Sequence, residues 1–297
     1  MPAPFVDQVC GYREGRPNTS DSNDTQSKEL GKIFFDAMGI QADAQPPKEA
    51  IGTHMARLMV EDLRTNYDVS APHLVVQPEK PFTSFEQFSH LNATKELGTN
   101  MAKEVTRTVD ALRKFSAATS LEEEFRDALA EHLDNIHREV QVAESRRRDL
   151  LDLLGEESLL KLDVTVSKSI VNSIKPNTPL QHLVAGFSLK WTLRTDRAQD
   201  CRSQGSKMAA LRRGRMPHFA TVTMEPRPSM LALLARGSGD VDCVYHLHLP
   251  ALSTALDDYC SGTNRKARLN IRDTFRRLCD QRRIRDYDEL RDYVATL

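Results

Sequence analysis

Asp163 and Lys190 are the first residues whose types and spacing suggest chemistry. They lie 27 residues apart, each in a segment with the apolar pattern of a β-strand, and neighbouring strands would bring them together. The Asp163 carboxylate, the Leu189 main-chain carbonyl and a substrate phosphate are oxygen ligands that a hard divalent ion prefers. Lys190 would orient or activate a water and offset negative charge at phosphorus. The pair predicts phosphodiester hydrolysis, although its spacing alone is a weak signal.

The segments that must position this pair alternate between strand and helix. The patterns predict strands at residues 162–167, 187–193, 218–224 and 241–249, and helices at 198–211, 229–235 and over much of 250–297. Strands interleaved with helices predict an α/β fold with a mixed central β-sheet flanked by helices.

The N-terminal half has a mainly helical pattern. We expect helices from about residue 28 and over residues 49–65, and a short strand at residues 74–76. The clearest helix covers residues 120–154, where Ser120 and Glu123 form a capping box and apolar residues recur along one stripe. That stripe predicts a helix that packs in the core or against another subunit.

Length and composition predict one domain over residues 1–297. Within it we expect a polar N-terminal arm at 1–27, a mainly helical part at 28–155, a catalytic α/β core at 156–252 and C-terminal helices at 253–297. Hydrophobic residues at 39% and charged residues at 28% are typical of a soluble globular protein, and no membrane span or secretory signal is recognised. The expected compartment is the cytoplasm. Five widely spaced cysteines predict reduced thiols.

Charge is unevenly distributed along the chain. The formal net charge is −1, but residues 188–215 contain eight basic and two acidic residues. This stretch predicts a phosphate-facing surface on an otherwise neutral protein.

Four sequence blocks after Asp163 strengthen the prediction that Asp163 and Lys190 form an active site. They read Ser-Leu-Lys-Trp-Thr-Leu-Arg-Thr-Asp-Arg-Ala-Gln at 188–199, Arg-Arg-Gly-Arg-Met-Pro-His at 212–218, Met-Glu-Pro at 224–226 and Asp-Cys-Val-Tyr-His at 242–246. In this order they closely resemble the CCGG-cutting type II restriction endonucleases, especially the NgoMIV type, of the PD-(D/E)XK nuclease superfamily. The resemblance is strong over residues 162–252 and thin elsewhere.

The resemblance implies a role for each matching residue. Asp163 and Lys190 match the catalytic aspartate and lysine, and Ser188 belongs to the same Ser-x-Lys strand. The family's Arg-x-Asp-Arg reads the central base pairs of CCGG, and it matches Arg194, Asp196 and Arg197. Without the resemblance, these three residues would be read as a helix-start cluster with Asp196 as the cap.

Two departures concern the acidic groups of the family site. Gln204 occupies the position of an acid fourteen residues after the lysine, where its amide can still hydrogen-bond to Ser188 or a water. Ala56 aligns with a glutamate on an N-terminal helix. Glu61, about a turn and a half later, is an alternative that could compensate, but on a helix it would face a different way.

Recognition of the outer base pairs has a weaker basis. Asp21 resembles the family aspartate that reads the outer pair. The family's outer-pair arginine aligns with Met230, while Arg227 lies three residues earlier.

Together these features predict a Mg²⁺-dependent homodimer or homotetramer that hydrolyses double-stranded DNA at a palindrome containing CCGG, with GCCGGC as one candidate and 5′-phosphates as products. A cytosine methyltransferase would be its functional partner. One alternative is a DNA-binding relative with weak or lost cleavage. Another is an unrelated α/β protein with a basic helix.

Overall fold

The computed structural model describes residues 2–67, 73–92, 101–119, 122–154, 160–171, 179–237, 239–261 and 266–297. The chain forms two compact units, one made of residues 1–88 and 161–297 and the other of residues 89–160. The expected helical part at 28–155 is therefore divided between two units. No helix in the described ranges is long and apolar enough to cross a membrane.

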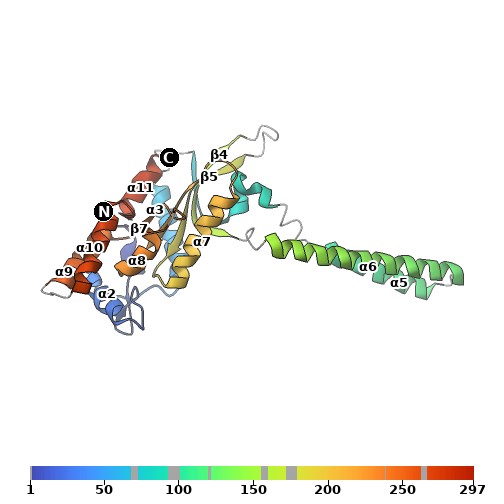
Figure 1. Cartoon of the computed structure of the whole chain (residues 1–297), viewed down its shortest axis with the longest axis horizontal. Helices are drawn as coiled ribbons and strands as arrows, with labels where there is room; N and C mark the ends of the chain where they lie inside the picture. Colours follow the sequence, from blue (N-terminus) through green and yellow to red (C-terminus); the bar gives the residue numbers. More distant parts are fainter. Residues whose placement is uncertain are drawn as a thin grey trace. The chain divides into compact units, whose positions relative to one another are not determined.

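A six-stranded sheet forms the centre of the larger unit (Figure 1). Its strands, in spatial order, are β3 (Leu74–Pro81), β4 (Lys161–Ile170), β5 (Leu180–Lys190), β6 (His218–Thr223), β7 (Cys243–His246) and β8 (Ile284–Asp286). The pairs β3–β4 and β4–β5 are antiparallel, and β5 to β8 pair in parallel. The predicted α/β fold with a mixed central sheet is confirmed.

Helices surround this sheet. They are α2 (Thr25–Met38), α3 (Ile51–Tyr67), α7 (Thr195–Leu211), α8 (Pro228–Ala235), α9 (Leu249–Cys260), α10 (Lys266–Asp280) and α11 (Tyr287–Ala295). The helix α3 contacts β3, β4 and β5, and it also contacts α11, while α7 packs against α8. Sequence periodicity predicted most of these helices to within a few residues.

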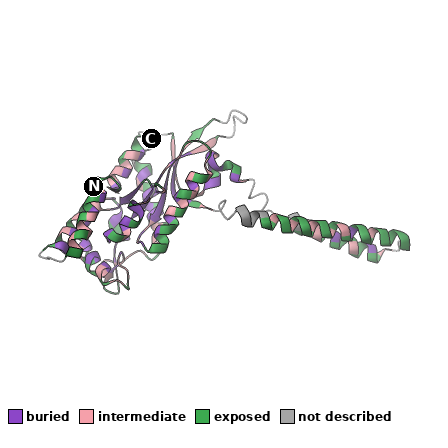
Figure 2. Ribbon diagram, in the orientation of Figure 1, coloured by how far each residue is buried: buried purple, intermediate pink, exposed green. Residues whose placement is uncertain are grey.

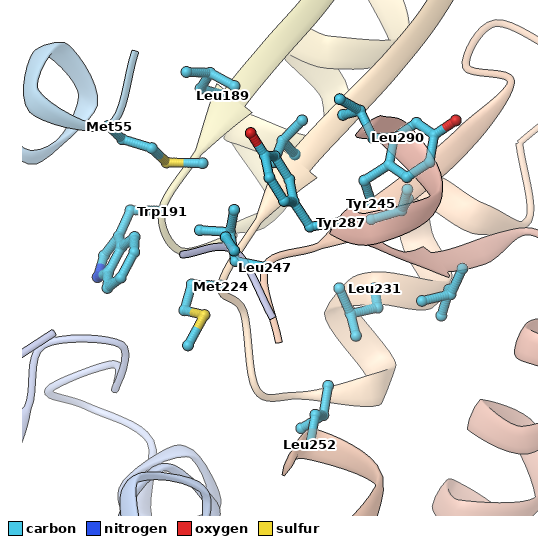
Figure 3. Close-up of a cluster of buried hydrophobic side chains, with 14 of the residues drawn as sticks. Met55, Leu189, Trp191, Met224, Leu231, Tyr245, Leu247, Leu252, Tyr287 and Leu290 are labelled. Carbon is cyan, nitrogen blue, oxygen red and sulfur yellow. The ribbon is translucent and has the colours of Figure 1, made fainter. Parts of the chain in front are cut away.

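The strands carry the core of this unit. Figure 2 shows the buried residues concentrated along the sheet and on the helix faces turned toward it. Figure 3 shows a cluster in which Met55 of α3, Leu189 and Trp191 at the end of β5, and Tyr287 and Leu290 of α11 lie around one another. Trp191 is a core residue. Burial at the end of β5 therefore fixes the strand that carries Lys190.

Two strands differ from the sequence prediction. The strand β3 runs through Pro78 to Pro81 rather than ending at residue 76. A proline is tolerated there because β3 is an edge strand whose outer side needs no partner. The three-residue strand β8 was not predicted, because it is too short to produce a pattern.

The expectation of an N-terminal polar arm is wrong. Residues 6–9 form α1 (Val6–Val9), followed by a hairpin of β1 (Tyr12–Arg13) and β2 (Arg16–Pro17). The side chains of Phe5, Val6 and Val9 are buried in the main core. These apolar residues are too few and too closely flanked by polar residues to produce a periodic pattern.

The smaller unit contains two long helices, α5 (Met101–Ala118) and α6 (Glu123–Leu154), which pack against each other. The 3-10 helices η1 (Phe82–Ser84) and η2 (Glu86–Leu91) precede them. Leu133 of the predicted α6 stripe is buried, but Phe125 and Ile136 are exposed, because α5 covers only part of the stripe. The capping residue Ser120 lies outside the described residues.

Candidate active site

Asp163 and Leu189 meet where two strands separate. The main-chain ladder between β4 and β5 ends at Val164 and Phe187. Beyond it, Asp163 Oδ2 accepts a hydrogen bond from the Leu189 main-chain N–H at 2.6 Å. The side chain thus replaces the missing ladder partner, and the predicted carboxylate lies beside the β5 segment that carries Lys190.

The surroundings of Asp163 oppose its ionisation. Burial raises the pKa of its carboxyl, and the charge of Glu79 raises it further. The Leu189 N–H, the charge of Lys190 and the Ser188 hydroxyl lower this pKa without reversing the shift. A partly buried carboxylate with this balance is stabilised by a cation, which is the environment that a metal site supplies.

Ser188 and Lys190 project from the same face of β5, because side chains alternate along a strand. Ser188 is buried, and its hydroxyl oxygen accepts a weak hydrogen bond from Cys201 Sγ of α7 at 3.5 Å. The face of β5 that carries Lys190 is therefore turned toward α7.

Gln204 occupies a different position from the one expected of it. Its side-chain amide donates a hydrogen bond to the Lys161 carbonyl at the beginning of β4. Ser188 was one of two possible partners for this amide, and its hydroxyl accepts from Cys201 Sγ instead. Gln204 thus joins α7 to the strand that carries Asp163.

Gly205 allows α7 to approach the sheet closely. A Cβ atom added at Gly205 would lie 1.8 Å from the Asp240 carbonyl oxygen and 2.8 Å from the Phe219 ring. Any larger residue would force the helix away from β6.

The oxygen donors near Asp163 fit a hard divalent ion. In the ranges that the structure describes, no group of three or more His, Cys, Asp or Glu side chains could enclose a metal. Mg²⁺ typically binds through one or two carboxylates and completes its shell with water and substrate phosphate. The Asp163 carboxylate and the Leu189 carbonyl are consistent with such an open site.

The three predicted base-reading residues lie at the beginning of α7 and are exposed. Arg194 is the N-cap residue and makes no side-chain capping bond, whereas Asp196 lies in the first helical turn. The alternative with Asp196 as the cap is therefore wrong. Arg197 Nη1 donates to the Thr192 carbonyl at 3.3 Å and lies within 3.2 Å of the Thr192 hydroxyl.

Asp21 lies with two of these residues around one cavity of about 230 Å³. Its Oδ2 atom is 4.0 Å from Arg194 Nε and 3.6 Å from Arg227 Nη1. A hydrogen bond from the Asn23 N–H and the charges of the two arginines hold the pKa of Asp21 below its usual range, against the opposing effect of burial. The structure therefore brings Asp21 beside Arg194, although 173 positions separate them in the sequence.

Sequence reasoning missed Glu225, and it left Arg227 without a structural role. Glu225 is fully buried and accepts hydrogen bonds from the Leu193 N–H at 2.7 Å and from Arg227 Nε at 2.6 Å. Arg227 also donates to the Leu193 carbonyl at 2.7 Å and pairs with Asp24 at 3.1 Å. The available signal was a Glu-Pro-Arg sequence directly after an apolar strand. This ion pair holds the segment that leads into α7.

The other polar candidates are structural. His246 is buried against the Glu225 carbonyl, and His248 caps α9. All five cysteines are free, and four of them are buried. The C-terminal arginines form ion pairs such as Arg276–Asp257.

Comparisons with known proteins show that part of this chain is similar to one family. A sequence model of the family described as NgoMIV restriction enzyme matches residues 156–292. This segment is NgoMIV-like. It contains Asp163, Lys190, Arg194 and Arg227, and it extends beyond residue 252, where the resemblance of the sequence was expected to fade.

One curated protein is closely similar over a shorter stretch. The type II restriction enzyme NgoMIV of Neisseria gonorrhoeae is 49% identical over 80 residues. The alignment covers 27% of this chain and 27% of that enzyme. The similarity is high within a quarter of each chain, and the NgoMIV-like segment leaves out Asp21, Ala56 and Glu79.

Proposed function

We propose that this protein is a type II restriction endonuclease that hydrolyses double-stranded DNA at a palindromic site containing CCGG, with Mg²⁺ as cofactor. The observation that carries the proposal is the Asp163–Leu189 hydrogen bond, which joins the two strands of the NgoMIV-like segment beside Lys190. A carboxylate, a carbonyl and an ammonium at one strand end suit phosphodiester hydrolysis.

Each site residue of this chain would have a separate role in cleavage. Asp163 and the Leu189 carbonyl would hold Mg²⁺, which when bound polarises the scissile phosphate and lowers the pKa of a coordinated water. Lys190 would orient the attacking water and offset the negative charge that develops on the phosphate oxygens. Ser188 would help to hold the Asp163 carboxylate. Gln204 would position the beginning of β4 relative to α7.

Base recognition would come from the exposed first turn of α7. Arg194 and Arg197 can each donate two hydrogen bonds to guanine, and Asp196 can accept one from cytosine N4. Each good pair discriminates by about 1–3 kcal/mol against the wrong base. Asp21, at the edge of the same cavity, would contact an outer base pair, with GCCGGC as a candidate site.

A palindromic site implies a symmetric assembly. Two copies related by a two-fold axis would contact the two half-sites equally, so we propose a homodimer or a homotetramer built from such dimers. Cleavage would leave 5′-phosphates. A cytosine methyltransferase acting on the same sequence in the same cytoplasm would protect host DNA.

Plasmid cleavage tests this proposal. The purified full chain is incubated with plasmid DNA with and without Mg²⁺, and the cut ends are sequenced. We expect cuts at CCGG-containing sites when Mg²⁺ is present and no cuts when it is absent. Cuts at sites without CCGG would refute the proposed specificity.

A lysine variant tests the role of Lys190. Lys190→Ala should lose cleavage while it retains a CCGG duplex in a gel shift. Lys266→Ala removes an exposed lysine at the beginning of α10 and should cleave normally. Cleavage by Lys190→Ala at the natural rate would refute the assigned role.

The second candidate function is sequence-specific DNA binding with weak or lost cleavage. It is favoured by Gln204, which supplies an amide where the family has an acid, and by Ala56. Retention of a CCGG duplex without any Mg²⁺-dependent cutting would support it. In that case Gln204→Glu should restore cleavage if the amide is the cause.

A further inference from the structure

Glu79 lies on β3 directly opposite Asp163 of β4. The ladder between these strands pairs the residues on both sides of Glu79 with the residues on both sides of Asp163. Residues that face each other across antiparallel strands have Cβ atoms about 4.5–5.5 Å apart in a regular ladder. The charge of Glu79 acts on Asp163 at this range, because it adds to burial in raising the pKa of that carboxyl.

The backbone at Glu79 is unusual. Its φ is 44°, in the left-handed region that residues other than glycine rarely adopt. Such a conformation is strained, and outliers of this kind concentrate at active sites and ligand sites. In β3 the outlier falls at the position beside Asp163, where a turn or a strand end does not explain it.

Glu79 also lines a cavity of about 610 Å³ between α3 and β3. Ala56 of α3 lines the same cavity, and it is the position where the family resemblance implies a glutamate. The small alanine side chain leaves open space there. Glu79 of the strand therefore lies beside the same cavity as the helix position that lacks a carboxylate.

We infer that Glu79 supplies the second metal-binding carboxylate of the active site, in place of the acid that is missing at Ala56. The inference rests on the proposed nuclease function. Glu79, Asp163 and the Leu189 carbonyl make an oxygen donor set for one divalent cation, with water and phosphate in the remaining positions. Two carboxylates on adjacent strands repel each other, and a cation between them removes this repulsion.

Glu61 is the rival for this role, since it lines the same cavity from α3. It lies on the helix rather than on the strand that pairs with β4. Glu61→Gln is therefore a matched comparison for Glu79→Gln, because both variants remove one exposed carboxylate from one cavity.

Manganese binding tests the inference without relying on activity. The full chain is bound to a duplex with non-hydrolysable linkages throughout CCGG, and Mn²⁺ is titrated while its paramagnetic resonance signal is followed. Glu79→Gln should weaken Mn²⁺ binding by at least about 10-fold, because loss of a group that only supports a metal ligand already costs about 10–100-fold. Glu61→Gln should bind within about 2-fold of the natural chain, and Asp163→Asn should lose binding, by the same reasoning.

The Glu79→Gly variant distinguishes loss of the carboxylate from a folding defect. Glycine adopts a φ of 44° without strain, so this variant should melt no lower than the natural chain and still lose Mn²⁺ affinity. A Glu79→Gly variant that keeps full Mn²⁺ affinity would contradict the inference.

The remaining outcomes separate this inference from the proposed function. Loss of binding in Asp163→Asn but not in Glu79→Gln overturns the role of Glu79 and leaves the nuclease proposal intact. Loss in Glu61→Gln alone moves the second carboxylate to α3 and also overturns it. A natural chain that neither binds Mn²⁺ nor cuts DNA refutes the nuclease function itself.

Discussion

His246 is a buried residue whose protonation makes the stability of the protein depend on pH. Its ring lies between the Glu225 carbonyl, 3.3 Å from Nε2, and the His248 N–H, which donates to Nδ1 at 3.1 Å. Burial lowers the pKa of His246 from 6.5 to about 3. The neutral ring is therefore part of the packing behind Glu225 and Arg227.

Acid should destabilise the protein through this residue. The pKa is lower in the folded chain, so its stabilising contribution is complete above pH 6.5 and is lost as pH falls toward 3. One such group changes the free energy of unfolding by about 1.4 kcal/mol per pH unit. His246→Gln should be less stable at pH 7.5 but should show a flatter profile of melting temperature between pH 6.5 and 4.5. Equal slopes for both proteins would contradict this prediction.

At the scale of elements, Arg227 holds three segments together behind the first turn of α7. It contacts Glu225 after β6, the Leu193 carbonyl before α7, and Asp24 at the beginning of α2. Its guanidinium is mostly buried, at 7% exposed, so its partners have little access to water. The pair formed with Glu225 connects the proposed base-reading residues, which come from distant parts of the sequence.

Removing this arginine should therefore be costly. Arg227→Leu leaves Glu225 as a buried charge without its main partner, which typically costs about 3–5 kcal/mol of folding free energy. Urea unfolding measures this loss, and a gel shift should also reveal weaker binding of the CCGG duplex. Arg236→Ala removes an exposed arginine at the end of α8 and serves as the control. A cost below about 1 kcal/mol for Arg227→Leu, the scale of an exposed ion pair, would contradict the structural role.

Substitution of Gly205 tests how closely α7 must approach the sheet, and Gly52 of α3 provides the comparison. Gly205→Ala should destabilise the protein, because the new Cβ would collide with the Asp240 carbonyl. In an open helix the same exchange stabilises by about 1 kcal/mol. Gly52→Ala on α3 meets open space and should show that gain.

Melting temperatures of the two variants should therefore move in opposite directions. Gly205→Ala should also weaken DNA binding, since α7 carries the proposed base-reading residues. A stabilised Gly205→Ala variant would mean that α7 can shift without cost.

At the scale of the whole molecule, positive charge is concentrated in one stretch of the chain, although the net charge is close to zero. The net charge is −1, yet residues 188–215 are strongly basic. Binding should therefore depend on local phosphate contacts and should weaken steeply with salt. For 6–10 such contacts, affinity falls by about 10³–10⁵-fold between 50 and 200 mM salt.

Titration of a CCGG duplex at several salt concentrations measures this slope. Lys207→Ala on α7 should reduce the slope by about one phosphate contact, without changing sequence preference. Affinity that does not change with salt would contradict a phosphate-facing surface on this part of the chain.

Patterns among residues that are close in the sequence predict much of the fold. The alternation around Asp163 and the apolar run before Lys190 predicted two strands, and helical spacing predicted α3 and α7. The adjacent Arg194, Asp196 and Arg197 could be grouped for the same reason, since one helical turn keeps them together. Local periodicity depends on residues a few positions apart, so the sequence alone carries it.

Only the tertiary structure determined which distant residues meet. Glu79 and Asp163 lie 84 positions apart, with the α5–α6 unit between them in the chain, and they face each other only through the β3–β4 register. Asp21 reaches Arg227 in the same way, through packing of the N-terminal segment against the core. Strand register and core packing arise from contacts among many separated residues, so no local pattern in the sequence could predict these pairs.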